Sequence, residues 1–240
     1  MIRFRPYPGL TIAGAIAFAI LVWLGVWQLQ RLQWKLALIA TVQAHMVAPP
    51  ISLDQALRMN ADDVQYRRVA LAGRFDNGKE AYLFTTGPSG EPAYHVLTPF
   101  ISDDGKTMLV DRGLVPEDKR PAASRIPVDG PTRIVAVWRV PDPPNGFTPV
   151  PDPARHVWYA HDMAGLARAS GVSWTAPVVL EADSHPNPGG WPKGGQTVVS
   201  FRNEHLQYAL TWFGLAAGLL GVYLAYHVSK GRLSFGGKGQ

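Results

Sequence analysis

The chain has 240 residues, a formal net charge of +5 at pH 7 and no cysteine. Without cysteine it can have no disulfide, no thiolate site for zinc or copper, no covalent c-type haem and no cysteine nucleophile. A role in delivering copper through thiolates is therefore excluded.

The excess positive charge lies in the two tails, residues 1–9 and 229–240. Neither tail contains an acidic residue, and together they carry five cations: Arg3, Arg5, Lys230, Arg232 and Lys238. Between the tails the chain has as many basic as acidic residues, 18 of each, so we predict no nucleic-acid partner. Because cations collect at the cytoplasmic ends of membrane spans, both tails are expected in the cytoplasm.

An apolar stretch at residues 10–30 predicts a first membrane helix. A cleaved signal peptide is the alternative for this region. The length of the stretch and the lack of an A-x-A-like exit favour an uncleaved anchor. The helix is expected to continue to about Met46, before Pro49 and Pro50 end it.

A second apolar stretch predicts a membrane helix at residues 205–228. No Asp, Glu, Lys or Arg occurs from Leu206 to Ser229, which is long enough to cross the bilayer. His205, Tyr208 and Trp212 stand at its start with the spacing i, i+3 and i+7, so they share one stripe of the helix.

A matching stripe of aromatic residues lies near the end of the first span. Trp23, Trp27, Gln30 and Trp34 fall within about 60° of one another on a helical wheel. Tryptophan collects at membrane interfaces whatever the function, but Trp23 lies too deep for that explanation alone. The stripe therefore suggests a face for a partner or a ligand.

Two polar residues, Gln28 and Arg31, lie at the same level of the first span. An arginine just past a span usually extends its charge to the lipid head groups. The alternative is an arginine placed to bind a carboxylate. The sequence alone leaves both explanations open.

Residues 31–204 are predicted to form an extracytoplasmic domain with a largely antiparallel β structure, a barrel or a sandwich, and one or two short helices. Ser52 and Gln55 indicate a capping box, and Asp162 to Ser170 indicates a second helix. DNG at 76–78 and DDG at 103–105 suggest hairpin turns. The expected strands cover residues 67–75, 80–84, 93–100, 107–115, 133–140, 157–160 and 176–183.

Signatures of catalysis are missing from the sequence. It has no H-E-x-x-H, no G-x-S-x-G and no glycine-rich phosphate loop in a strand–loop–helix setting. His156 and His161 are spaced wrongly for neighbouring metal ligands on a helix or on one face of a strand. Asp111 and Arg112 suggest a salt bridge or a turn before a catalytic pair. We therefore predict that the chain is not an enzyme.

The two spans run antiparallel, so their polar and aromatic residues near His205 and Arg31 meet at the outer leaflet. An imidazole there is more often a hydrogen-bonded interfacial residue than a metal ligand. His227 cannot join His205, because it lies 22 positions further along the helix, and a rise of 1.5 Å per residue places it about 33 Å away.

Four segments resemble the surfeit locus protein 1 family: LGVWQLQRLQWK (24–35), YHVLTPF (94–100), LVDRGLVP (109–116) and NEHLQYALTWFGLA (203–216). Trp158 and Asp162 before a short helix also fit. The resemblance follows the same order over nearly the whole chain. It implies two membrane spans around an extracytoplasmic domain and, for a bacterial member, a place in the cell inner membrane with the central domain in the periplasm.

The resemblance also implies a function. The family assists assembly of haem-copper cytochrome c oxidase, and bacterial members bind haem a before its insertion into the catalytic subunit. That subunit and haem a synthase are the expected protein partners, besides the lipid bilayer. A haem-free scaffold that binds the nascent oxidase subunit is the alternative, and a membrane enzyme is a distant third.

Within that resemblance, His205 is the expected axial ligand of the haem iron. Arg31 or Arg202 would meet the propionates. The remaining residues expected at the haem site are Trp27, Gln28, Tyr208 and Trp212.

Overall fold

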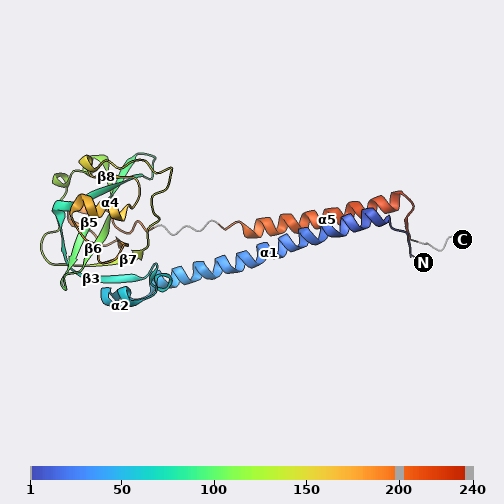
Figure 1. The fold of residues 1–240 in the computed structure, drawn as a ribbon, viewed down its shortest axis with the longest axis horizontal. Coiled ribbons are helices and arrows are strands. Elements are labelled where there is room, and N and C mark those ends of the chain that lie inside the picture. Colours follow the sequence, from blue (N-terminus) through green and yellow to red (C-terminus); the bar gives the residue numbers. More distant parts are fainter. Residues whose placement is uncertain (1, 198–202, 236–240) are drawn as a thin grey trace. The chain divides into compact units, whose positions relative to one another are not determined.

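The structure, a computed structural model, describes residues 2–197 and 203–235. The chain divides into two compact units. Met1–Ala40 with Ser200–Gln240 forms the unit that holds most of the two long helices, and Thr41–Val199 forms a β-rich unit (Figure 1). The predicted class, two apolar helices that flank a β-rich domain with a few short helices, is confirmed.

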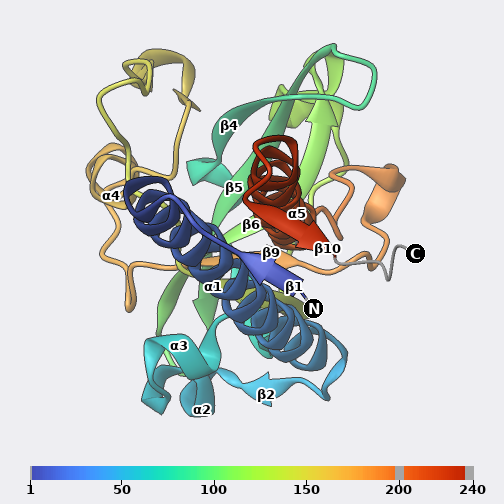
Figure 2. The same cartoon turned by 90° about the vertical axis from the view of Figure 1, so that its right-hand side faces the viewer.

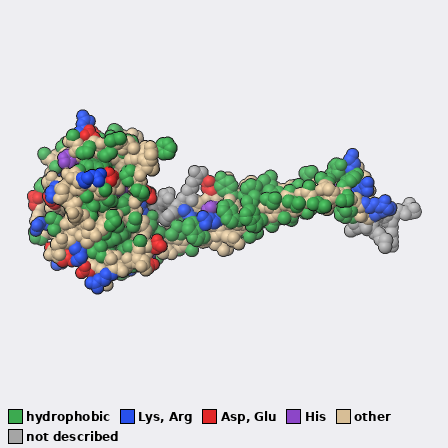
Figure 3. All heavy atoms as spheres, viewed as in Figure 1, with side chains coloured by type: hydrophobic (Ala, Val, Ile, Leu, Met, Phe, Trp, Pro, Cys, Tyr) green, Lys and Arg blue, Asp and Glu red, His purple; other side chains and the backbone are tan. Residues whose placement is uncertain are grey.

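Two helices, α1 (Pro8–Val47) and α5 (His205–Ser229), are long and apolar enough to cross a membrane. Only 6% and 11% of the residues in their most apolar windows are buried, whereas a core helix of a soluble protein is mostly buried. Hydrophobic side chains cover most of the surface of these helices (Figure 3). Both helices extend beyond the membrane spans predicted for them, so the bilayer boundaries at residues 10–30 and 205–228 stay predictions.

Small residues allow α1 and α5 to approach closely. A Cβ atom added at Gly25 of α1 would lie 2.7 Å from the ring of Phe213 of α5. On α5, Ala209 and Ala216 are 1% and 3% exposed. Helices in membranes pack in this way because the lipid supplies no hydrophobic force to bring them together.

The two tails pair with each other, which the sequence did not predict. Strand β1 (Ile2–Phe4) lies antiparallel to β10 (Leu233–Phe235), as Figure 2 shows. The Arg5 N–H donates a further hydrogen bond to the carbonyl of Arg232 at 2.8 Å. Strands of three residues are too short to show a periodic pattern. As a result of this pairing, both tails lie at the same end of the helix pair.

His227 is fully buried beside the tails. Its Nδ1 lies 2.8 Å from the Tyr223 carbonyl, and its ring lies against those of Phe4 and Tyr7. The Tyr223 hydroxyl in turn lies 2.7 Å from that of Thr11 on α1. These contacts give His227 a structural role at the tail end of the helix pair, away from His205.

The β-rich unit contains a closed barrel. In order around the barrel, β3 pairs with β7, β7 with β9, β9 with β6, β6 with β5, and β5 again with β3. These strands are β3 (Arg68–Phe75), β5 (Pro92–Ser102), β6 (Thr107–Pro116), β7 (Thr132–Arg139) and β9 (Val179–Ala182). Of the two predicted β architectures, the barrel is therefore the one that forms.

Three further strands extend the barrel sheet. They are β2 (Ile51–Ser52) beside β3, β4 (Ala81–Thr86) beside β5, and β8 (Val157–Trp158) beside β4. The predicted largely antiparallel pairing holds for most neighbours, but β2–β3, β4–β8 and β6–β9 are parallel. Parallel neighbours need long crossover connections, and β9 is reached only after the long segment that follows β7.

Two apolar cores lie on the two faces of β6. Met108 and Val110 face the barrel interior and pack with Leu71 of β3, among others. The alternate residue Leu109 faces outward and packs with Trp158 and with Leu166 of a covering helix. Because both faces of β6 are buried, Met108, Leu109 and Val110 form a continuous apolar run instead of alternating with polar residues.

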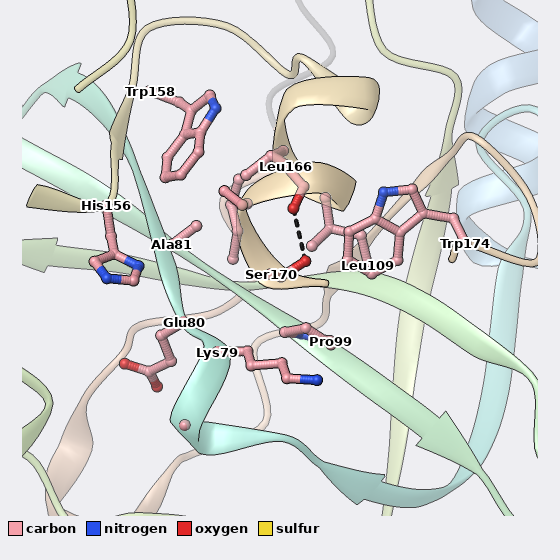
Figure 4. Close-up of a pocket in the computed structure, with 13 residues that line it drawn as sticks. Lys79, Glu80, Ala81, Pro99, Leu109, His156, Trp158, Leu166, Ser170 and Trp174 are labelled. Carbon is pink, nitrogen blue, oxygen red and sulfur yellow. Dashed lines mark hydrogen bonds between the residues drawn. The ribbon is translucent and has the colours of Figure 1, made fainter. Parts of the chain in front are cut away.

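Short helices close this outer core and one end of the barrel. Helix α4 (Met163–Ser170) begins at the predicted N-cap Asp162 and ends at Gly171. Figure 4 shows α4 over Leu109 and Ala81, around a cavity of about 90 Å³. Helix α2 (Leu53–Arg58) has the predicted capping box of Ser52 and Gln55.

The remaining helical segments are single turns. They are α3 (Ala61–Val64) and the 3₁₀ turns η1 (Asn77–Lys79), η2 (Glu117–Lys119), η3 (Ala122–Ser124), η4 (Pro153–Arg155) and η5 (Pro188–Gly190).

One of the two predicted hairpin turns is wrong. The DDG sequence at 103–105 does connect the antiparallel neighbours β5 and β6. The DNG sequence at 76–78 leads through η1 from β3 to β4, and these strands are not neighbours in the sheet. Because β3 closes the barrel by pairing with the end of β5, β4 pairs with the other part of β5 instead.

Gly73 is required where the barrel closes. It pairs with Ser102 of β5 and with Thr132 of β7, and an added Cβ atom would overlap the Ile101 carbonyl oxygen and lie 2.7 Å from Ser102 Cα. We predict that Gly73→Ala lowers the free energy of unfolding by about 1–3 kcal/mol, because backbone atoms cannot move aside as a side chain can.

Urea unfolding of the full chain measures this effect. Gly78→Ala is the matched control, because a Cβ atom there meets only the Asp76 carboxylate at 3.8 Å. It should change stability by less than about 0.5 kcal/mol. Equal stability of the two variants would contradict a tight closure at Gly73.

Candidate functional site

His205 lies on the stripe of α5 that faces α1. The stripe continues through Ala209, Phe213 and Ala216 at helical spacing, and Phe213 is the residue that meets Gly25 of α1. His205 is the first residue of α5 and lies on the face toward α1, at the end of α5 away from the tails.

The imidazole of His205 is hydrogen-bonded across the helix pair. Its Nδ1 lies 2.8 Å from the Oε1 atom of Gln28 on α1. An amide oxygen only accepts hydrogen bonds, so Nδ1 carries the proton and donates it. In the neutral ring, Nε2 then holds a lone pair in a fixed orientation. A group of this kind can bind a metal ion or accept a proton.

Arg31 contacts its own helix. Its guanidinium carbon lies 4.7 Å from the centre of the Trp34 ring, a cation–π contact on the surface of α1. Both side chains are exposed. The structure thus brings Gln28 to His205, whereas the contact found for Arg31 leaves its charge available to lipid or to a ligand.

The tryptophans of α1 lie on the face opposite α5. Trp23, Trp27 and Trp34 are 64%, 42% and 53% exposed. At about 100° per residue they fall roughly 180° from Gly25, which faces Phe213. Trp27 therefore points away from the contact between α1 and α5 that includes His205. Its expected role in contacting a ligand stays a prediction.

The two aromatic residues of the His205 stripe, Tyr208 and Trp212, lie beside the contact between α1 and α5. Tyr208 is 51% exposed. The indole Nε1 of Trp212 is buried, and within residues 2–197 and 203–235 it has no hydrogen-bond partner. Arg202, the other expected propionate contact, lies outside the described residues.

Comparison with known proteins identifies the family. The model of the SURF1 family matches residues 15–217, which include the contact between Gln28 and His205. The chain belongs to the SURF1 family. The expected resemblance to the surfeit locus protein 1 family is thereby confirmed.

Animal and bacterial members of the SURF1 family are similar over most of the chain. Surfeit locus protein 1 of Mus musculus is 39% identical over 211 residues, which cover 81% of this chain and 68% of the mouse protein. The Homo sapiens protein of the same name is 35% identical and covers the same share of this chain and 69% of its own length. A SURF1-like protein of Rickettsia bellii (strain RML369-C) is 30% identical over 88% of both chains.

Two other segments that carry the SURF1 resemblance meet in the β-rich unit. His95 on β5 lies with its Nδ1 2.8 Å from Oδ2 of Asp111 on β6. The other carboxylate oxygen of Asp111 accepts a hydrogen bond from the Gly113 N–H at 2.8 Å. Of the two alternatives expected at Asp111 and Arg112, a salt bridge or a turn, the salt bridge is present, with Arg112 paired to Glu80 at 3.1 Å, and both residues lie inside strand β6.

The sequence analysis missed the partner of Asp111. A hairpin around the DDG turn at 103–105 pairs Leu97 with Asp111, which brings His95 within reach. Counting the register outward from that turn would have placed Leu97 opposite Asp111, but the irregularity between His95 and Leu97 has no signal in the sequence.

The environment of His95 shifts its pKa upward. Burial lowers the pKa of this imidazole, but the Asp111 carboxylate raises it by more, so that it lies above its ordinary value of 6.5. A raised pKa in the folded state stabilises the fold below pH 6.5, and this contribution is lost as the pH rises through the folded-state pKa.

We predict that Asp111→Asn reverses the direction of this shift. Without the carboxylate, burial dominates and the pKa of His95 falls below that of the wild type. Histidine titration by ¹⁵N NMR on the full chain measures the midpoint directly. Asp62→Asn, at an exposed position of α3, is the control and should leave the His95 midpoint unchanged. An unchanged midpoint in Asp111→Asn would contradict the pairing.

Proposed function

We propose that this SURF1-family chain is a membrane-bound assembly factor for haem-copper cytochrome c oxidase. It binds haem a at the outer membrane interface and assists its insertion into the catalytic subunit of the oxidase. It is not an enzyme, and it acts by holding and presenting the haem. Haem a synthase is the proposed donor partner.

The contact between Gln28 and His205 carries this proposal. A histidine that ligates a metal usually donates its other ring N–H to a neighbouring group, which fixes the tautomer and the ring orientation. Gln28 Oε1, 2.8 Å from Nδ1, is such a group, and it leaves Nε2 for an iron ligand. When bound, the haem supplies an iron that accepts a neutral imidazole.

Other residues near His205 have chemistry that suits the same ligand. The buried Nε1–H of Trp212 lacks an acceptor within the described residues, and a polar group of a ligand would supply one. The exposed guanidinium of Arg31 suits a propionate, because its planar fork binds carboxylates with two hydrogen bonds. Tyr208 and Trp27 would contribute aromatic surface.

A haem-free scaffold for a nascent oxidase subunit is the second candidate. The exposed face of Trp23, Trp27 and Trp34 favours it, since this face points away from α5 and suits a partner helix. Of these residues, Trp34 also suits lipid head groups, because it lies beyond the end of the predicted span, whereas Trp23 lies deeper. The two candidates differ in whether the purified protein carries haem.

We also propose that both tails are cytoplasmic and that the central domain is periplasmic, in a bacterial inner membrane. Residues 1–9 and 229–240 are then the cytoplasmic tails, and residues 31–204 are the periplasmic domain. The pairing of β1 with β10 supports a common side for the tails. Their cations, which include Arg3, Arg5 and Arg232 among the described residues, favour the cytoplasmic side.

We predict that His205→Ala shifts or removes the Soret band of haem a bound to the full chain purified from a haem a-producing host. The variant should still fold, because one lost hydrogen bond costs only about 1 kcal/mol. Gln28→Leu keeps His205 as the iron ligand but removes the hydrogen bond that orients its ring. Haem affinity should therefore fall about 10- to 100-fold, with His205 still bound to the iron.

His185→Ala is the matched control, since His185 is an exposed histidine of the β-rich unit. Its spectrum should equal that of the wild type. A His205→Ala protein that is correctly inserted and has the wild-type spectrum would disprove the ligand assignment. Wild-type protein that never contains haem would favour the scaffold.

Reporter fusions test the topology. We predict that alkaline phosphatase is inactive when fused after Lys238 and active when inserted at Gly146, in an exposed loop of the β-rich unit. The enzyme folds only outside the cytoplasm, so activity after Lys238 would reverse the orientation.

A further inference from the structure

A buried ion cluster in the barrel holds one more cation than anion. Arg112 and Arg125 both contact Glu80, and the three side chains are at most 6% exposed. Arg125 binds both carboxylate oxygens of Glu80, at 3.3 Å and 2.6 Å. Arg112 binds only one of them, at 3.1 Å. Arg125 alone therefore neutralises Glu80, and Arg112 is the surplus charge.

Among the described residues, the other contacts found for Arg112 carry no negative charge. One is the side-chain oxygen of Asn77 at 3.2 Å, and another is the ring of Phe75, whose centre lies 4.6 Å from the guanidinium carbon. The Nε atom of Arg112 is buried and has no hydrogen-bond partner within the described residues. A buried cation with an unpaired donor is unfavourable unless an anion reaches it.

Arg112 is also part of the wall of a cavity of about 770 Å³. It points to the barrel interior, because it follows Met108 and Val110 on the same face of β6. Most of the lining is apolar, from strands β3, β7 and β9 and the loop before β7. The apolar side chains include Leu71, Phe75, Val128, Ile134 and Ala182.

The charge of this lining is positive. The charged residues that line the cavity among those described are Arg112, Arg133 and Asp183. The Asp183 carboxylate already lies 3.7 Å from Arg68. An anion from outside the chain is therefore the group that Arg112 lacks.

We propose that this cavity binds an apolar molecule with a single carboxylate, of the fatty-acid type. The carboxylate lies against Arg112, and the chain lies along the apolar wall of β3 and β7. A cavity of several hundred Å³ with apolar walls and few polar groups has the features of a small-molecule site. The guanidinium fork matches the two oxygens of a carboxylate. This site is independent of His205.

The experiment uses the full chain in phosphatidylcholine nanodiscs with a photoreactive palmitic acid and the corresponding photoreactive alcohol. Mass spectrometry then maps the crosslinked residues. We expect the acid to label β3, β7 and residues 183–188 at least about tenfold more than the alcohol does, as the loss of a charged hydrogen bond implies. Labelling of α1 and α5 by both probes reports the partition of the probes into the lipid. Excess oleate should remove only the labelling of the barrel.

Two variants separate the site from a structural role of Arg112. Val128→Trp fills the cavity and leaves the ion cluster intact, so barrel labelling should be lost. Val150→Trp, at a position that is 85% exposed, is the matched control and should be labelled like the wild type. Arg112→Met leaves Glu80 paired with Arg125. It should reduce labelling of the barrel by the acid to the level found with the alcohol.

Equal labelling of the barrel by the acid and the alcohol would overturn the proposal. So would wild-type labelling of Val128→Trp, or crosslinks confined to the helices. If Arg112→Met does not fold, Val128→Trp still decides the question, because its charges are unchanged.

Discussion

Polar groups on a membrane helix need partners within the protein, because the surrounding hydrocarbon offers none. The helix pair meets this requirement at both ends of its seam. Near the tails, Thr11 lies beside Tyr223, and His227 bonds to the backbone. At the other end, His205 bonds to Gln28. Between them, Gly25 and the small residues of α5 bring the helices close enough for these contacts to form.

The local features of the fold could be predicted from the sequence. The apolar stretches predicted the two long helices, and the stretches rich in β-branched residues predicted most of the strands. Ser52 and Asp162 correctly indicated where two short helices begin. The barrel closure could not be predicted, because it joins β3 to β5 and β6 to β9 by backbone contacts that leave no local pattern. The hairpin predicted at the DNG sequence is wrong for the same reason, because β4 pairs with β5 and not with β3.

For the candidate site, the sequence indicated the residues but not their geometry. His205 and Gln28 were expected at the same depth in the membrane. Their hydrogen bond could not be predicted, because it depends on how the two helices are rotated and shifted against each other. The orientation of Trp27 away from α5 depends on which face of α1 carries the close contact at Gly25. The cluster around Glu80 was beyond prediction, because Arg112 and Arg125 are separated from it by 32 and 45 residues.

The pairing of β1 with β10 makes the two ends of the helix pair mechanically unequal. The tail end is fixed by backbone hydrogen bonds and by the packed rings around His227, which no ligand can replace. The contact between Gln28 and His205 is a single hydrogen bond between two side chains, so it holds the helices together less strongly. The tail end is therefore the more strongly held end of the helix pair, because separating α1 from α5 there would break backbone pairing as well as side-chain packing.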